Sequence, residues 1–180
     1  MRITLIRHPR PQVAPGVCYG STDLAVAQEQ LDQVLATLAG TLPAGAPLYS
    51  SPLRRCADLA QRIGSTTPIY DARLAEMHFG AWEMQRWDDI PCAEIDAWAA
   101  DLVRYQPGGG ESVLQMATRI ADFYADLRAG PAADIVIVCH AGTMRLLMAR
   151  HAGLAPAAMA LHAASTPHSI AYGERIVLQD

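Results

Sequence analysis

The sequence lacks an excess of basic side chains. Its 180 residues carry 14 Lys and Arg against 18 Asp and Glu, a formal net charge of -4. Proteins that bind nucleic acids or membrane surfaces generally present a basic face, so this balance argues against both kinds of partner. Any basic site must therefore be local.

Long apolar runs are also missing. No stretch reaches the length of a transmembrane helix, and the apolar run after Arg2 is too short for the core of a signal peptide. The four cysteines lie far apart and form no C-x-x-C pair, which argues against a zinc knuckle or a redox dithiol. We expect a reduced protein in the cytoplasm.

Metal-binding and repeat signatures are absent as well. The six histidines include no H-x-x-x-H or H-E-x-x-H spacing, which argues against a metalloenzyme. Internal repeats and low-complexity linkers are missing, and 51% of the residues are hydrophobic, enough to bury one substantial core. We therefore expect a single domain over residues 1–180. The sequence leaves the oligomeric state open.

Strand-like and helix-like patterns alternate along the chain. Ile3–Ile6 and Asp134–Cys139 are apolar runs typical of strands buried on both faces. Apolar residues at i, i+3, i+4 and i+7 predict a helix over 25–39, and Ser112 with Gln115 forms a capping box that starts another. This alternation predicts a three-layer α/β/α sandwich with a mostly parallel central sheet.

Three further segments have weaker patterns. Residues 48–51 predict a second strand, and Ser51-Pro52 predicts a helix start with serine as the cap and proline as the first helical residue. Residues 87–105 are helical in character but carry a proline, so we expect a broken or bent helix. Residues 169–179 predict either a pair of strands or one long bent strand.

Charged and imidazole side chains follow the predicted strands. Arg7 and His8 come directly after the first strand, His140 follows the strongest one, and Arg54 or Arg55 lies one turn into the helix after the second. Ligands of such sheets bind outside the carboxyl ends of the strands, so we expect these side chains to converge there. Guanidinium forks match phosphate oxygens, and the sequence therefore predicts a site for a dianion.

Five motifs occur in an order that resembles a known family. They are the Arg7-His8 dipeptide, SSPLRR, LAEMHFGAWE, GGGES and VCHAGTMR. Together they resemble the histidine phosphatase (phosphoglycerate mutase-like) superfamily over nearly the whole chain. The pattern R-H-x-x-P-x-V-x-x-G-x-C-Y-G-x-x-D, from Arg7 to Asp23, is similar to the α-ribazole phosphatase-like group associated with cobalamin synthesis.

The resemblance implies a phosphomonoesterase that acts on a small phosphate ester without a metal ion or another cofactor. His8 would be the nucleophile, which must be neutral when it attacks phosphorus, and Arg7 would help to keep it unprotonated. Arg7 and Arg55 would hold the phosphoryl oxygens. In the family pattern the arginine three positions after the proline is the functional one, which favours Arg55 over Arg54.

The resemblance also implies roles for residues from other segments. His140 would be a second phosphate ligand, and Glu76 would be the general acid for the leaving alkoxide and then the base for water. Backbone N–H groups around Tyr19-Gly20 and at Ala141 would add contacts to the oxyanion. Residues 77–110 would form a lid that determines substrate specificity.

The sequence departs from the wider family at Pro9, where glycine is usual, so one backbone N–H is absent beside His8. It leaves open whether His78 or His168 reaches the site. Three alternatives to an α-ribazole 5′-phosphate phosphatase also stay open. One is a mutase, although Arg86 and Arg104 are few for a substrate carboxylate. The others are a broad-specificity sugar or nucleotide phosphatase, and a phosphoester-binding module without catalysis.

Overall fold

The computed structural model describes residues 1–64, 66–167 and 169–180. The strands are β1 (Arg2–Arg7), β2 (Leu48–Ser50), β3 (Ile69–Tyr70), β4 (Asp134–Cys139) and β5 (Arg175–Gln179). The α-helices are α1 (Gln28–Leu38), α2 (Arg54–Ile63), α3 (Cys92–Ala100), α4 (Val113–Ala129), α5 (Ala141–His151) and α6 (Pro156–Ser165). Short 3₁₀ turns are η1 (Ala72–Leu74), η2 (Gly80–Trp82), η3 (Trp87–Asp89) and η4 (Pro107–Gly109).

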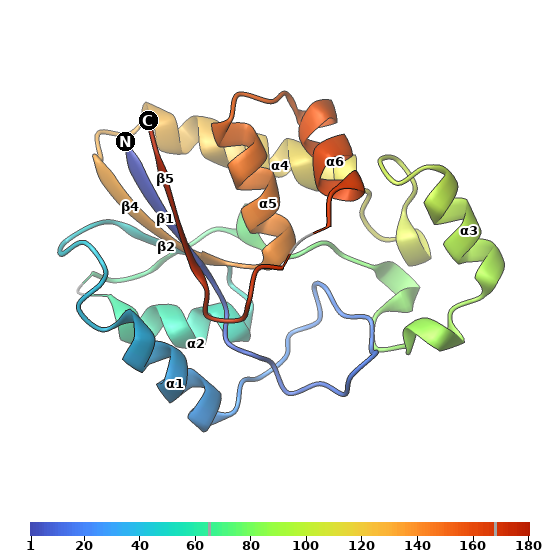
Figure 1. Ribbon diagram of the computed structural model, residues 1–180, viewed down its shortest axis with the longest axis horizontal. Coiled ribbons are helices and arrows are strands. Elements are labelled where there is room, and N and C mark those ends of the chain that lie inside the picture. Colours follow the sequence, from blue (N-terminus) through green and yellow to red (C-terminus); the bar gives the residue numbers. More distant parts are fainter. Residues whose placement is uncertain (65, 168) are drawn as a thin grey trace.

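The strands form one mostly parallel sheet in the order β3-β2-β4-β1-β5. Strand β1 runs parallel to β4, β4 to β2 and β2 to β3, whereas β5 pairs antiparallel with β1. Helices α1 and α2 cover one face, and α4, α5 and α6 cover the other (Figure 1). The predicted three-layer α/β/α architecture is therefore confirmed.

Both faces of the sheet are buried, and β4 shows how. Ile135 and Ile137 pack with α4, α5 and α6, whereas Val136 and Val138 pack with α1 and α2. Successive side chains of a strand point to opposite faces, so a strand covered on both sides needs apolar residues at every position. This is why the sequence of β4 has no polar alternation.

Several predicted elements are confirmed at or near the expected boundaries. Strand β4 has the predicted bounds, and α1 lies inside the predicted range. The capping box of α4 is present: Gln115 donates its backbone N–H to the Ser112 hydroxyl, and its side chain accepts from the Ser112 N–H. The helical region after Trp87 is broken, as expected, into η3 and α3.

Two local predictions are wrong. Helix α2 begins at Arg54 with Leu53 as its N-cap, so Ser51 and Pro52 do not start it. Ser51 lies between β2 and α2, where its hydroxyl accepts from the Leu53 N–H at 3.3 Å and lies 2.8 Å from His140 Nε2. At the C-terminus, residues 169–179 form neither a strand pair nor one long strand, because β5 starts only after a turn at Gly173 (φ +74).

Residues 79–110, which we call the cap segment, lie beside the carboxyl end of the sheet (Figure 1). The segment has a small core of its own, in which Trp82 and Ile90 pack with Cys18. Its two ends meet backbone to backbone. A Cβ on Gly108 would lie 2.4 Å from the Phe79 carbonyl oxygen, so glycine is needed for this contact.

No helix in the described part of the chain is long and apolar enough to cross a membrane.

Candidate active site

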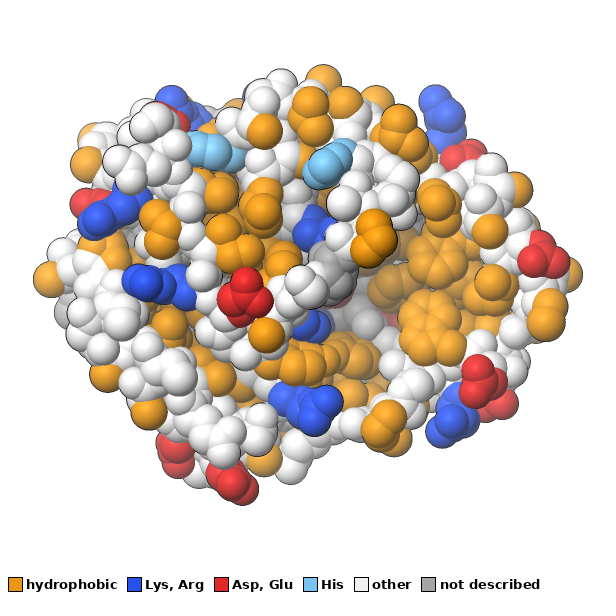
Figure 2. All heavy atoms as spheres, viewed as in Figure 1, with side chains coloured by type: hydrophobic (Ala, Val, Ile, Leu, Met, Phe, Trp, Pro, Cys, Tyr) orange, Lys and Arg blue, Asp and Glu red, His pale blue; other side chains and the backbone are white. Residues whose placement is uncertain are grey.

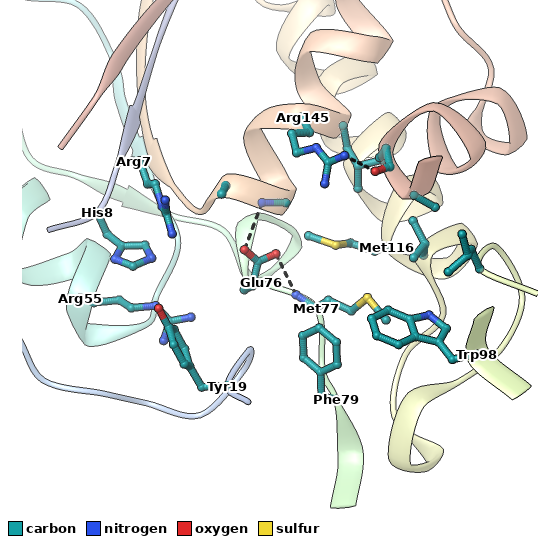
Figure 3. Close-up of a pocket in the computed structure, with 17 residues that line it drawn as sticks. Arg7, His8, Tyr19, Arg55, Glu76, Met77, Phe79, Trp98, Met116 and Arg145 are labelled. Atoms are coloured by element: carbon teal, nitrogen blue, oxygen red, sulfur yellow. Dashed lines mark hydrogen bonds between the residues drawn. The ribbon is translucent and has the colours of Figure 1, made fainter. Parts of the chain in front are cut away.

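A cavity of about 360 Å³ lies between the cap segment and the carboxyl ends of β1, β2 and β4. The space-filling view is hollowed at this position, with apolar side chains on the cap side (Figure 2). The cavity has a polar half and an apolar half (Figure 3). The polar half is lined by Arg7, His8, Tyr19, Arg55 and Glu76.

His8 is a buried imidazole whose protonation is fixed by its neighbours. Its Nδ1 lies 2.7 Å from the Pro9 carbonyl oxygen, which can only accept, so Nδ1 carries the proton and Nε2 keeps its lone pair. Burial lowers the pKa of His8 well below its usual value, helped by the positive charges of Arg55 and then Arg7. Proline keeps the carbonyl that glycine would offer, so Pro9 is compatible with this arrangement.

His140 lies directly behind His8, with ring centroids 5.0 Å apart. Arg55 Nε donates to its Nδ1 at 3.2 Å, and its Nε2 lies 2.8 Å from the Ser51 hydroxyl. Burial, followed by the charges of His8 and Arg55, lowers the pKa of His140. His140 is completely buried and is not among the described residues that line the cavity.

Arg55 is completely buried at the start of α2, and its guanidinium is fixed by backbone carbonyls. Its Nη1 donates to the Thr22 carbonyl at 2.8 Å and its Nη2 to the Gly20 carbonyl at 2.5 Å. Arg54, by contrast, is exposed and does not line the cavity. The structure thus brings Arg55 to His8, and Gly20 enters the site through its carbonyl oxygen.

Arg7 is oriented by a residue that the sequence did not indicate. Its guanidinium carbon lies 3.9 Å above the ring of Tyr172, and its Nη1 donates to the Ile170 carbonyl at 2.5 Å. The Tyr172 hydroxyl lies 2.7 Å from the Tyr19 hydroxyl, and the Tyr172 ring centroid lies 5.6 Å from that of His8. Only the antiparallel pairing of β5 with β1 brings Tyr172 here, and no local pattern reveals that pairing.

Glu76 stands on the wall next to the N-terminus of α5. Its two carboxylate oxygens accept from the backbone N–H groups of Met77 and Gly142, each at 3.1 Å. The segment that carries Glu76 is held by Arg119, which donates to the carbonyls of Ala75 (2.8 Å) and Glu76 (3.3 Å). Arg119 also forms an ion pair with Glu111 of the GGGES motif at 2.7 Å.

Glu83 links the cap segment to the loop of residues 19–22. Its carboxylate accepts from the backbone N–H and the hydroxyl of both Ser21 and Thr22, and from the Phe79 N–H. Burial opposes ionisation, but the hydrogen bonds from Thr22, Ser21 and Phe79 outweigh it and lower the pKa of Glu83 to about 2. The loop that it holds supplies the carbonyls that bind Arg55.

The remaining predicted positions are divided. Tyr19 and Ala141 line the cavity, Ala141 as the first residue of α5. His78 is exposed in a shallow depression on the other side of Glu76. His168 lies outside the described residues. Over the described ranges, no three His, Cys, Asp or Glu side chains gather in a way that could hold a metal ion.

The fold and the site place charged and imidazole side chains together at the carboxyl edge of a mostly parallel sheet. The sequence matches the Histidine phosphatase superfamily (branch 1) over residues 3–173, and the chain belongs to this family of metal-independent phosphatases.

Known relatives support the family and differ in their substrates. The chain is 29% identical over 161 residues to the adenosylcobalamin/alpha-ribazole phosphatase of Salmonella typhimurium, covering 83% of this chain and 79% of that protein. The alpha-ribazole phosphatase from Shigella flexneri superposes with a TM-score of 0.83 and 26% identity, over 99% of this chain and 90% of that one. Mycobacterial glucosyl-3-phosphoglycerate phosphatase superposes with a TM-score of 0.79 and 25% identity, over 99% of this chain and 89% of that one.

Proposed function

We propose that the protein hydrolyses a small phosphate monoester through a phosphohistidine formed on His8, and that α-ribazole 5′-phosphate, an intermediate of cobalamin synthesis, is its substrate. One observation carries the catalytic part of the proposal. The His8 ring stands between Arg7 and Arg55 on the cavity wall, with a lowered pKa, Nδ1 bound to the Pro9 carbonyl and the lone pair of Nε2 left free of that bond (Figure 3).

In the first step, His8 Nε2 attacks phosphorus and the P–O bond to the leaving group breaks. The electron pair stays on the leaving oxygen, which takes a proton from the Glu76 carboxyl group. Arg7 and Arg55 bind the non-bridging oxygens, and Tyr19, Gly20 and Ala141 supply the surrounding backbone.

In the second step, water attacks the phosphohistidine while the Glu76 carboxylate takes its proton. The N–P bond breaks, its electron pair returns to Nε2, and inorganic phosphate leaves with Glu76 protonated again. His140 serves as a further phosphate ligand in this scheme. To do so, its Nδ1 must take up a proton and exchange Arg55 Nε, now 3.2 Å away, for a phosphate oxygen.

The apolar half of the cavity supports α-ribazole 5′-phosphate as the substrate, and the position of Arg86 argues against a mutase. The aromatic rings of Phe79 and Trp98, both in the cap segment, line the cavity and suit the flat base of α-ribazole. A mutase would need basic side chains in the cavity to bind the substrate carboxylate. Arg86 does not line the cavity; it is more than half exposed and lies 4.0 Å from Asp88, which argues against a mutase. We propose the cap segment as the lid that selects the leaving group.

A panel of esters with a chelator present tests the proposal. We expect the highest kcat/KM for α-ribazole 5′-phosphate, with glucosyl-3-phosphoglycerate and 3-phosphoglycerate as competitors, and free phosphate rather than an isomer as product. His8→Ala should lower kcat/KM by about 10⁴-fold or more and abolish acid-labile phosphate on the protein. His162→Ala, on the exposed surface of α6, is the control. Full activity of the His8→Ala variant would contradict the phosphohistidine mechanism.

A further inference from the structure

One ionisable side chain lines the cavity outside the polar half. Beyond Glu76, the described wall consists of apolar side chains from the cap segment, α4, α5 and α6, with Arg145 among them. Arg145 lies on α5, at the end of the VCHAGTMR motif, and has no assigned role in the two-step reaction. Its place near the apolar rings makes it part of the surface that the leaving group meets.

The surroundings of Arg145 leave its charge without a matching carboxylate. Its Nη2 donates to the Ala163 and Thr166 carbonyls near the end of α6. In the described part of the chain, no Asp or Glu oxygen lies within 4.0 Å of its guanidinium. Burial lowers the pKa of Arg145, partly opposed by the charge of Glu76. In Figure 3 one terminal nitrogen points at a carbonyl, and the other points into the cavity.

Donation to a backbone carbonyl does not require a place on the cavity wall. Arg150, also on α5, donates to the Leu154 carbonyl at 3.3 Å and does so away from the cavity. A guanidinium held against apolar side chains has lost part of its hydration, and an acceptor atom of the ligand would replace the lost hydrogen bonds to water.

We infer that Arg145 binds a hydrogen-bond acceptor at the end of the leaving group remote from the phosphoryl group. The inference rests on the proposed function and narrows its substrate class. The substrate is then a phosphate ester whose leaving group has a flat apolar body, packed against Phe79 and Trp98, and one acceptor atom beyond it. A leaving group covered with hydroxyls would find few partners on this wall.

A pair of matched esters tests this subsite. 4-(Carboxymethyl)phenyl phosphate and 4-ethylphenyl phosphate have similar shapes and leaving-group acidities, and differ in the remote acceptor. A corresponding pair of 2-naphthyl phosphates places the acceptor farther from the phosphoryl group. We expect the wild-type protein to prefer the acceptor-bearing ester of at least one pair by about tenfold or more in kcat/KM, the effect of a charge-assisted hydrogen bond.

Three variants separate recognition from a structural role. Arg145→Met should abolish the preference, Arg145→Lys should keep part of it because the charge remains, and Arg150→Met should keep all of it. If Arg145→Met lowers turnover of both esters equally, or if the wild-type protein shows no preference in either pair, the inference is wrong. If Arg145→Met does not fold, the inference is tested by the wild-type preference and by whether Arg145→Lys keeps only part of it. A wild-type protein that hydrolyses none of these esters would instead overturn the proposed function.

Discussion

The two ends of the cavity are built in different ways. At the end near the sheet, Arg7, Arg55 and His140 are each fixed by hydrogen bonds to backbone or buried side chains. At the other end, the aromatic rings belong to the cap segment: Phe79 directly precedes η2, and Trp98 lies on α3, where it stacks with Trp87 of η3 at a centroid distance of 6.2 Å. The first end positions charges where the sheet dictates; the second offers a surface whose shape depends on loops.

Glu83 connects these ends, so among substitutions outside the reacting groups its replacement should have the largest effect. Glu83→Gln keeps one acceptor oxygen but turns an NH₂ toward donors that now bind a carboxylate. Each buried donor left unpaired costs about 1–3 kcal/mol, and we expect kcat/KM to fall by about 100-fold. Inhibition by inorganic phosphate should weaken by about tenfold, because the loop that holds Arg55 is loosened.

Glu94→Gln is the matched control for this experiment. Glu94 is also in the cap segment, where it accepts one hydrogen bond from the Trp82 indole at 2.5 Å. A glutamine can accept that bond equally well, so phosphate inhibition should stay at the wild-type value. If Glu83→Gln leaves phosphate inhibition unchanged at full thermal stability, the two ends are independent.

A pair of glycines separates the cap end from the charged end. Gly108 has φ +58 and no room for a Cβ, whereas Gly109 has φ +72 and nothing within 4 Å of an added Cβ. Both alanine variants carry the left-handed strain of about 1–2 kcal/mol, and Gly108→Ala also forces the cap ends apart. We expect Gly108→Ala to raise KM for aryl esters by about tenfold, with phosphate inhibition unchanged. Equal KM values in the two variants would contradict this.

The remaining prediction concerns the stability of the charged end below neutral pH rather than activity. Burial lowers the pKa of His8 and of His140, so the unfolded chain binds more protons than the folded one between about pH 6.5 and the folded values. The contribution of these two groups to the free energy of unfolding should therefore be constant above pH 6.5. Below pH 6.5 it should fall by up to about 1.4 kcal/mol per pH unit for each ring.

Urea unfolding at pH 7.5, 6.5 and 5.5 measures this slope. His140→Asn removes one of the two rings and should reduce the slope, provided that it folds. His8→Ala gives the same test for the other ring. A free energy of unfolding that stays constant from pH 7.5 to 5.5 in the wild-type protein would show that these imidazoles are not held neutral by burial.

Strand ends were the part of the site that the sequence could predict. Apolar runs locate β1 and β4, and the residues after them, His8 and His140, meet because parallel neighbours end at one edge. Arg55 needed the family pattern, since both arginines of SSPLRR follow the same strand. The structure then separates them, with Arg55 fully buried and Arg54 outside the cavity.

The supporting residues could not be predicted in the same way. Glu83 and Arg145 lie inside motifs that the sequence analysis singled out, but hydrogen bonds to carbonyls and N–H groups leave no trace in residue spacing. Tyr172 reaches Arg7 only through the register of β5. Ser51 matched a helix-capping pattern, but its hydroxyl contacts His140, because tertiary contact overrides a local preference.

The contact between the two ends of the cap segment has a consequence for how this protein can diversify. Since the chain leaves the body at Phe79 and returns against it at Gly108, the stretch between them is an insert with a closed base. The part of this stretch beyond Glu83, which must stay to hold the loop that binds Arg55, can change in length and side chains while the sheet keeps its geometry. New substrates can thus arise by grafting here, without any change in the reaction itself.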